Sequence, residues 1–320
     1  MKHPTGPVKR FHGLAEAAAG LGILFTGAGL LGRYHWGLEL FSHYKPHLAI
    51  CFLIYAVIEF ALRSRRIAAL SLLLALINGL PLLSLRFFAP PRSEPFPKDA
   101  MHLRILQANI LTCNTNALAL LQLVEKEQPD VVILQEPNVR WLNQLASLTN
   151  RYPIYATMPR EDNFGAAIYC GPQASFAQIL QTQGPDYVPL TLACFKANNR
   201  RLNLVGIHAF APFNADHWQK RNNFTQALIP LLQQLPGARV ITGDFNNTPW
   251  STHFRTFLKT SGLRDSAQGR TYLPTWPTSQ WLLRIPLDHC LHSPEVRILA
   301  RRRGPNIGSD HFPLIIDIAF

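Results

Sequence analysis

The chain has 320 residues, a formal net charge of +12 at pH 7 and five cysteines. Its length exceeds that of one average domain. Residues 1–96 contain ten Lys or Arg and four Asp or Glu, and residues 97–320 contain 21 and 15, so each part carries a net charge of +6 and a basic tail is excluded. A basic excess of this size is compatible with phosphate-bearing ligands or anionic lipid surfaces and identifies neither.

The cysteines stand at positions 51, 113, 170, 194 and 290 without a CxxC pair, which excludes a thiolate metal site of the usual spacing. Their odd number excludes complete internal pairing. Buried small apolar residues are the preferred interpretation. A bridge between Cys170 and Cys194 stays open for an oxidising compartment.

Three apolar runs open the chain, over residues 14–32, 47–62 and 67–88. A helix needs about 20 apolar residues to cross the hydrocarbon core. The first and third runs satisfy this, whereas the second is short and contains Glu59. Three such runs without amphipathic alternation predict three transmembrane helices, and hence a membrane anchor over residues 1–88. A signal peptide is the alternative for the first run, but its AAA segment (17–19) lies at the start of the run and not at its end.

The basic turn RSRR at residues 63–66 predicts the orientation, because short basic loops stay on the cytoplasmic side. The expected location is the cell inner membrane, multi-pass, with the large domain periplasmic or extracytoplasmic. Residues 89–97 hold four prolines, which predicts an extended linker over residues 89–101.

The remaining residues, 102–320, mix many short apolar runs with a few amphipathic stretches. Strands are expected over residues 103–108, 131–135, 166–169, 190–196, 202–208, 238–242, 287–291, 296–300 and 312–318. Helices are expected over residues 116–127, 138–148 and 215–235. Because the two kinds of element do not strictly alternate, the fold class is α/β, with two sheets in a sandwich and not one doubly wound sheet.

Polar residues follow several of these strands where a loop begins. They are Asn109, Glu136, His208, Asp244, Asn246, Asp288, Asp310 and His311. Each alone has an ordinary structural explanation as a turn residue, helix cap, core histidine or strand-edge carboxylate. As a set they predict one shared pocket, because ligand-binding groups commonly collect at one edge of a sheet.

The motifs around these residues resemble the endonuclease/exonuclease/phosphatase superfamily, which has the deoxyribonuclease-I-like fold. They are QANI (107–110), LQEP (134–137), IH (207–208), GDFN (243–246), PLDH (286–289) and SDH (309–311). The resemblance covers residues 102–320. Apolar spans precede the domain in some bacterial members.

The resemblance implies a Mg²⁺ cofactor, with Mn²⁺ as the alternative. Glu136 is similar to the principal metal ligand of the family, with Asn109 beside it, and Asp310 is expected at the metal or at a second metal position. Some members carry an Asp two residues after the first-motif Asn, where this chain has Leu111. That departure places more of the metal binding on Glu136.

The resemblance also implies catalytic roles. Asp244 would orient or deprotonate the attacking water, and Asn246 would hydrogen-bond that water or a phosphate oxygen. His311, polarised by Asp288, would stabilise the charge of the transition state. His208 would donate to a non-bridging phosphate oxygen.

Three further features have weaker expectations. Trp276, within residues 271–277, is expected either to bind substrate as a wall of the pocket or simply to pack. The arginines of residues 301–303 are expected in a solvated turn, with phosphate contact as the alternative. Arg221 is expected to form a salt bridge on its helix.

Together these features predict a membrane-anchored, Mg²⁺-dependent phosphoesterase that hydrolyses a phosphodiester or phosphomonoester by in-line attack of water. Its partners would be a phosphate-ester substrate, which is nucleic acid, lipid or a small molecule, and the lipid bilayer, with no obligate protein partner. One alternative is a non-catalytic membrane scaffold or phosphate-ligand binding module with a phosphoesterase-like domain. Another is a sensor or transporter, for which Glu59 is the only support.

Overall fold

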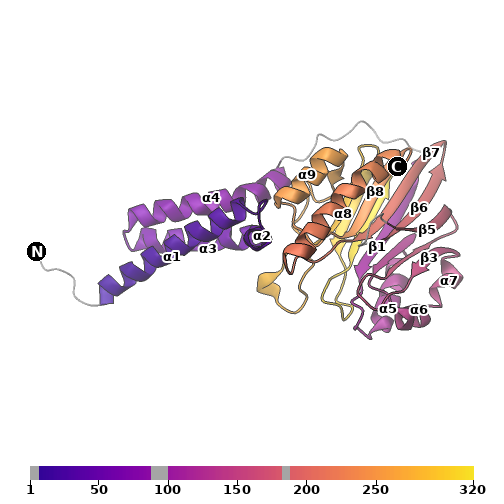
Figure 1. The fold of residues 1–320 in the computed structure, drawn as a ribbon, viewed down its shortest axis with the longest axis horizontal. Helices are drawn as coiled ribbons and strands as arrows, with labels where there is room; N and C mark the ends of the chain where they lie inside the picture. Colours follow the sequence, from indigo (N-terminus) through magenta and orange to yellow (C-terminus); the bar gives the residue numbers. More distant parts are fainter. Residues whose placement is uncertain (1–6, 88–99, 182–187) are drawn as a thin grey trace, which may run out of the picture. The chain divides into compact units, whose positions relative to one another are not determined.

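The structure is a computed structural model that describes residues 7–87, 100–181 and 188–320. The chain divides into two compact units, a helical one at the N-terminus and one of sheets and helices that follows (Figure 1). The predicted linker, residues 89–101, lies outside the described residues except for residues 100 and 101.

The N-terminal unit consists of α1 (Pro7–Leu30), α2 (Trp36–His43), α3 (Lys45–Ala61) and α4 (Arg65–Phe87). Within the described residues, one helix is long and apolar enough to cross a membrane, α4 over Arg65–Leu83. The pair α2 and α3 passes the same test only if taken together, and it is bent by 60°. The prediction of three transmembrane helices is therefore wrong, because one or at most two are found.

Local features explain the difference. The described apolar part of α1, Glu16–Leu30, is shorter than a span. Pro46 lies in the first turn of α3. A proline suits the first turn of a helix, so α3 begins beside it and has only 17 residues; the second run, residues 47–62, is therefore too short to cross on its own.

The second unit contains two six-stranded sheets. The first has the order β11-β12-β1-β2-β4-β3, with β1 (His102–Asn109), β2 (Val131–Gln135), β3 (Ile154–Met158), β4 (Ala166–Cys170), β11 (Arg297–Arg303) and β12 (Leu314–Ala319). The second has the order β5-β6-β7-β8-β10-β9, with β5 (Ala174–Gln181), β6 (Pro189–Ala197), β7 (Arg200–His208), β8 (Ala238–Asp244), β9 (Arg264–Asp265) and β10 (Asp288–His292). The pairs β1–β2 and β7–β8 are parallel. The predicted two-sheet α/β sandwich is confirmed.

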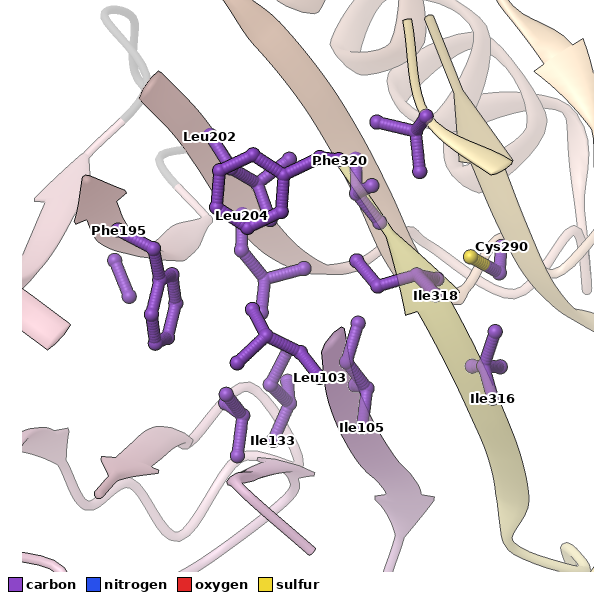
Figure 2. Packing of buried hydrophobic residues seen from close by; sticks show 14 of the residues in the cluster. Leu103, Ile105, Ile133, Phe195, Leu202, Leu204, Cys290, Ile316, Ile318 and Phe320 are labelled. Atoms are coloured by element: carbon purple, nitrogen blue, oxygen red, sulfur yellow. The ribbon is translucent and has the colours of Figure 1, made fainter. Parts of the chain in front are cut away.

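Three apolar clusters join the layers of this unit. One lies between the two sheets and includes Leu103, Ile105, Leu204 and Ile316 (Figure 2). A second packs the outer face of the first sheet against α5 (Ala117–Glu127), α6 (Val139–Gln144) and α7 (Leu148–Arg151). A third packs the second sheet against α8 (Ala215–Gln234) and α9 (Thr252–Ser261), which Figure 1 shows on the opposite side from α5 and α6.

The alternation of side chains along β1 explains where the polar residues gather. Leu103 and Ile105 face the other sheet, while Leu106 belongs to the cluster under α5. Because alternate residues of a strand face the same side, Gln107 and Asn109 continue the inter-sheet face. The core between the sheets therefore ends in polar side chains at the carboxyl end of this strand.

The structure also bears on the expectations for the arginines 301–303 and for the cysteine pair. The arginines 301–303 belong to strand β11, which pairs with β12, and not to a solvated turn. Cys170 and Cys194 are both buried free thiols, so the bridge left open between them is not formed.

Candidate active site

Strand register brings the motif residues of the second sheet side by side. His208 is opposite Asp244 in the parallel pair β7–β8, and Asp244 is opposite Asp288 in the antiparallel pair β8–β10. Directly opposite residues place their side chains on the same face of a sheet. Three residues that lie far apart in the sequence are therefore neighbours without any loop having to move.

Asn109 connects this row to the first sheet. Its Nδ2 donates to Glu136 Oε1 at 2.9 Å and to Asp244 Oδ2 at 3.2 Å. His208 Nε2 lies 3.6 Å from Asp244 Oδ2 and 3.9 Å from Glu136 Oε1. The ends of β1, β2, β7 and β8 thus contribute to one connected group of side chains, all of them buried.

The backbone at Glu136 is in a left-handed conformation, with φ of +69°. Non-glycine residues rarely adopt this conformation, and it persists where surrounding contacts fix it. Here the Glu136 N–H donates to Gly165 O at 2.9 Å, and the Thr112 N–H donates to Glu136 Oε2 at 3.0 Å. The strain turns the carboxylate toward Asn109 and His208.

Asn246 is the second strained residue, with φ of +47°. Its N–H donates to Asp244 Oδ1 at 2.8 Å, and its Nδ2 donates to Ala209 O at 2.9 Å and to Asp244 Oδ2 at 3.3 Å. The turn after β8 therefore fixes both oxygens of Asp244. Its amide lies beside the carboxylate, as the GDFN motif predicted.

His311 is held by a buried carboxylate. Its Nδ1 lies 2.8 Å from Asp288 Oδ2, and its Nε2 lies 3.5 Å from Asp244 Oδ2. The other oxygen of Asp288 accepts a hydrogen bond from Gln107 Nε2 at 2.9 Å. Gln107 Nε2 also donates to Gln135 Oε1 at 2.8 Å. The imidazole is thus oriented by a chain of hydrogen bonds that runs into the sandwich.

The charges of these groups depend on each other. Burial lowers the pKa of His311, but Asp288 and Asp244 outweigh it and raise that pKa to about 10, so the ring is an imidazolium at neutral pH. Burial raises the pKa of Asp288, whereas the charge and hydrogen bond of His311 bring it below its usual range. Burial, aided by repulsion from Asp288 and opposed by His311, raises the pKa of Asp244 to about 6. Asp288 and His311 therefore form an ion pair, while Asp244 can exchange a proton near neutrality.

The residues fit a hard divalent cation. Three buried carboxylates, Glu136, Asp244 and Asp288, face one imidazolium, so negative charge is in excess in a region that excludes water. Donor atoms of Asp244, Asp288 and His311 lie within 4.8 Å of one another. Carboxylate oxygens are the donors that Mg²⁺ and Mn²⁺ prefer. Glu136 lies outside this group of three and is joined to Asp244 through Asn109 Nδ2, which donates to both carboxylates.

Two of the expected metal residues are placed differently from Glu136. Asn109 directs its amide nitrogen to the carboxylates, and its Oδ1 accepts from the Leu111 N–H at 3.1 Å, so in this arrangement it holds the acids in place. Asp310 is half-buried and lies outside the donor cluster of the described residues. Its Oδ2 accepts from Trp276 Nε1 at 3.0 Å. The Trp276 ring, 6.5 Å from the His311 ring, stands beside the site as a wall.

Sequence reasoning gave no role to several residues that position the site. Gln107, described above, is one of them. Ser309 is another, because its Oγ donates to Asn109 O at 2.7 Å and accepts from the His311 N–H at 3.1 Å. Arg221, for which a salt bridge on its helix was expected, is fully buried, and its Nη1 donates to Asn246 O at 3.1 Å. Gln107 was detectable, because it is a polar residue at an inward position of a strand. Nothing local distinguishes Arg221 from other helix arginines.

Comparison with known proteins agrees with this fold. One similar structure is D. rerio TDP2 complexed with single strand DNA product, with 17% identity and a TM-score of 0.56, covering 68% of this chain and 98% of that one. The human Nocturnin catalytic domain with bound sulfate has 18% identity and a TM-score of 0.54, covering 70% of this chain and 96% of that one. A functionally unknown conserved protein from Enterococcus faecalis V583 has 17% identity and a TM-score of 0.57, covering 68% of this chain and 99% of that one. At these identities they show a shared fold. No curated protein matches the sequence.

A family model described as Endonuclease/Exonuclease/phosphatase family matches residues 106–311, which include every polar strand-end residue described above. Members of this family are generally phosphoester hydrolases. The chain belongs to the endonuclease/exonuclease/phosphatase family.

Proposed function

We propose that the domain hydrolyses a phosphodiester or phosphomonoester by in-line attack of water, with Mg²⁺ or Mn²⁺ as cofactor. One observation carries the proposal: Glu136, Asp244, His208 and His311 come from both sheets and meet in a single buried group. Acids, amides and an imidazolium at one point are what phosphoryl transfer to water requires.

Asp244 is the proposed base. Burial raises its pKa to about 6, so at neutral pH it is largely ionised and still basic enough to take a proton from water. The proton would go to Oδ2, which lies beside His208 and His311 and accepts longer hydrogen bonds, of 3.2 and 3.3 Å, than the 2.8 Å bond from the Asn246 N–H to Oδ1. The Asn246 amide, 3.3 Å from the same Oδ2, is placed to hold the water in line.

His311 would supply positive charge to the phosphate. Asp288 occupies Nδ1, so the Nε2–H points toward Asp244 and the reacting group. A preorganised donor of this kind contributes roughly 100- to 1000-fold to a rate. His208 lies on the other side of Asp244 and is the proposed second donor to a non-bridging oxygen.

Glu136, braced by Asn109, would hold the metal ion. When bound, it would offset the negative charge that develops on the phosphate oxygens. The departure at Leu111 removes a further carboxylate from this shell, so Glu136 is the decisive ligand.

Hydrolysis of bis-p-nitrophenyl phosphate by the full chain, with Mg²⁺ or Mn²⁺ added, tests the proposal. Wild-type turnover is expected, with losses of roughly 100-fold or more in Asp244→Asn and in His311→Gln. Asp216→Asn, at an exposed acid of α8, is the matched control and should behave as wild type. Folded wild-type protein without turnover on any phosphate ester would favour the scaffold alternative. A substrate panel should include single-stranded DNA, because the neighbour TDP2 was solved with a single strand DNA product.

We also propose that α4, alone or with the bent pair α2 and α3, anchors the chain in a bacterial inner membrane. The basic turn at residues 63–66 would face the cytoplasm and the domain after α4 the periplasm. Protease added to spheroplasts should then cut the domain without lysis. Protection of the domain until lysis would reverse the orientation, and extraction by alkaline carbonate would exclude the anchor.

A further inference from the structure

Three consecutive large apolar side chains are exposed at the tip of the loop before β10. They form the short 3-10 helix Trp281–Leu283, and their exposed fractions are 71%, 63% and 45%. Single exposed apolar residues are common on proteins, but a contiguous group marks a surface that contacts something apolar. We call residues 278–284 the apolar loop.

The first residue of the apolar loop is hydrogen-bonded to the turn that precedes His311. The Thr278 N–H donates to Asp310 O at 2.9 Å, and its Oγ1 donates to Ser309 O at 2.8 Å. Two residues earlier, Trp276 donates to the Asp310 carboxylate. Whatever contacts the tip is therefore close to the turn that carries His311.

Two arginines, Arg284 at the end of the apolar loop and Arg303 on β11, both lie against the ring of Phe312. The guanidinium carbons of Arg284 and Arg303 are 4.8 and 4.2 Å from the centre of the Phe312 ring. Their bonds go to carbonyl oxygens, those of Pro277 and Thr278 for Arg284 and that of Pro274 for Arg303. Within the described ranges of the chain, no acid lies at ion-pair distance from either. Two adjacent positive charges without a counter-charge attract an anion.

The chemistry of the loop favours a lipid surface as the occupant. Tryptophan prefers the membrane interface, leucines enter the acyl boundary, and arginines below them meet lipid phosphates. A nucleic acid strand would stack on Trp281, but Leu282 and Leu283 offer it no stacking surface. The same chain contains α4, which is long and apolar enough to cross a bilayer.

We propose that the apolar loop docks on an anionic lipid surface, with Trp281, Leu282 and Leu283 in the interface and Arg284 and Arg303 at the headgroup phosphates. This surface adjoins the site, so the substrate class becomes phosphate esters of membrane lipids. That last consequence rests on the proposed function, whereas the docking itself does not.

Fluorescence of the full chain reconstituted in vesicles tests docking directly. The emission of Trp281 is the difference between wild type and Trp281→Phe. With phosphatidylcholine–phosphatidylglycerol vesicles, we expect this emission to be quenched by lipids brominated in the upper acyl chain and shielded from acrylamide. Phosphatidylcholine alone or high salt should weaken the effect, because the arginine attraction is screened. Full access to acrylamide, or quenching by a single-stranded oligonucleotide in place of lipid, would overturn the proposal.

Turnover separates docking from chemistry. The triple variant replaces Trp281, Leu282 and Leu283 by serine. Its turnover of a lipid phosphate ester, divided by its turnover of bis-p-nitrophenyl phosphate, should be about tenfold or more below that of the wild type, since interfacial binding scales with buried apolar area. The matched control is Leu118→Ser on α5, because Leu118 is 65% exposed, against 63% for Leu282. An unchanged ratio refutes membrane lipid esters as the substrate class, whereas no turnover of the soluble ester by wild type refutes the proposed function and leaves the quenching result valid.

Discussion

Asp288→Asn is the sharpest test of the charge arrangement, because it changes one charge and almost no volume. The carboxylate accepts from His311 Nδ1 at 2.8 Å and from Gln107 Nε2 at 2.9 Å. The new amide can keep its oxygen toward His311 if its nitrogen faces Gln107. Gln107 can accommodate that by turning, because its buried Oε1 has no hydrogen-bond partner among the residues that the structure describes. The substitution therefore leaves the fold in place and removes the charge that sustains the imidazolium.

The magnitude follows from that hydrogen bond. A hydrogen bond to a charged group contributes about 1.5–3 kcal/mol, and about 1.4 kcal/mol corresponds to tenfold. If the imidazolium acts on the transition state, kcat/KM should fall about 10- to 100-fold. The assay is steady-state hydrolysis of bis-p-nitrophenyl phosphate, with circular dichroism to confirm the fold.

A matched control comes from the neighbouring strand. Asp265 on β9 is also buried, but its Oδ1 accepts from the Ala267 N–H, away from the site. Asp265→Asn should change stability and leave kcat/KM within about twofold. The reasoning is refuted if Asp288→Asn keeps near wild-type kcat/KM while folded, or if Asp265→Asn loses as much.

Three further predictions concern the metal, the backbone and pH. Mg²⁺ or Mn²⁺ at about 100 times its dissociation constant should raise the free energy of unfolding of the wild type by about 2.7 kcal/mol, measured in thermal melts. Glu136→Gln should lose most of this stabilisation. Equal stabilisation of the variant would exclude Glu136 as a ligand. Gly243→Ala should lower the free energy of unfolding in urea by about 2 kcal/mol or more, because φ is +147° and a Cβ would lie 2.0 Å from the Ile207 carbonyl oxygen. Gly262 is also at positive φ, but a Cβ there would meet no atom within 4 Å, so Gly262→Ala should cost only about 1 kcal/mol. Equal costs would contradict the steric argument. The hydrogen bond from Arg302 lowers the pKa of Glu127, so its stabilisation is present above the unfolded-state pKa and lost as pH falls through the folded-state pKa. Glu127→Gln should therefore lower the urea midpoint at neutral pH and match wild type in acid, and a pH-independent difference would count against this linkage.

The most deeply buried strands were predictable from the sequence, whereas two half-exposed strands were missed. Strands β1, β2 and β8 are buried almost throughout, and their apolar runs marked them in the sequence. Strands β3 and β5 lie at sheet edges and are half-exposed, so their apolar signal is diluted by polar residues. The two-residue β9 is too short to carry a pattern. Among the helices, α2 has only eight residues and precedes the apolar run 47–62, so it is too short to carry a clear pattern of its own.

The site residues were predictable as a set, but their arrangement was not. Asn109, Glu136 and Asp244 each follow an apolar strand, which is visible in the sequence. That Asp244 is opposite both His208 and Asp288 depends on strand register, which no local pattern gives. The register also decides the charges, because the pKa of His311 is raised only when two acids lie beside it.

The position of the site explains how the fold tolerates it. Asp244 and Asp288 are almost fully buried and repel each other, which is unfavourable in a region that excludes water. They sit at the end of the inter-sheet core, where ladder hydrogen bonds fix their backbones and each buried Leu or Ile contributes about 1.5–3 kcal/mol. The core therefore offsets the repulsion, and His311 neutralises only part of it. A bound cation would relieve the remainder, so the same burial that makes the acids repel each other would also favour a positive ligand.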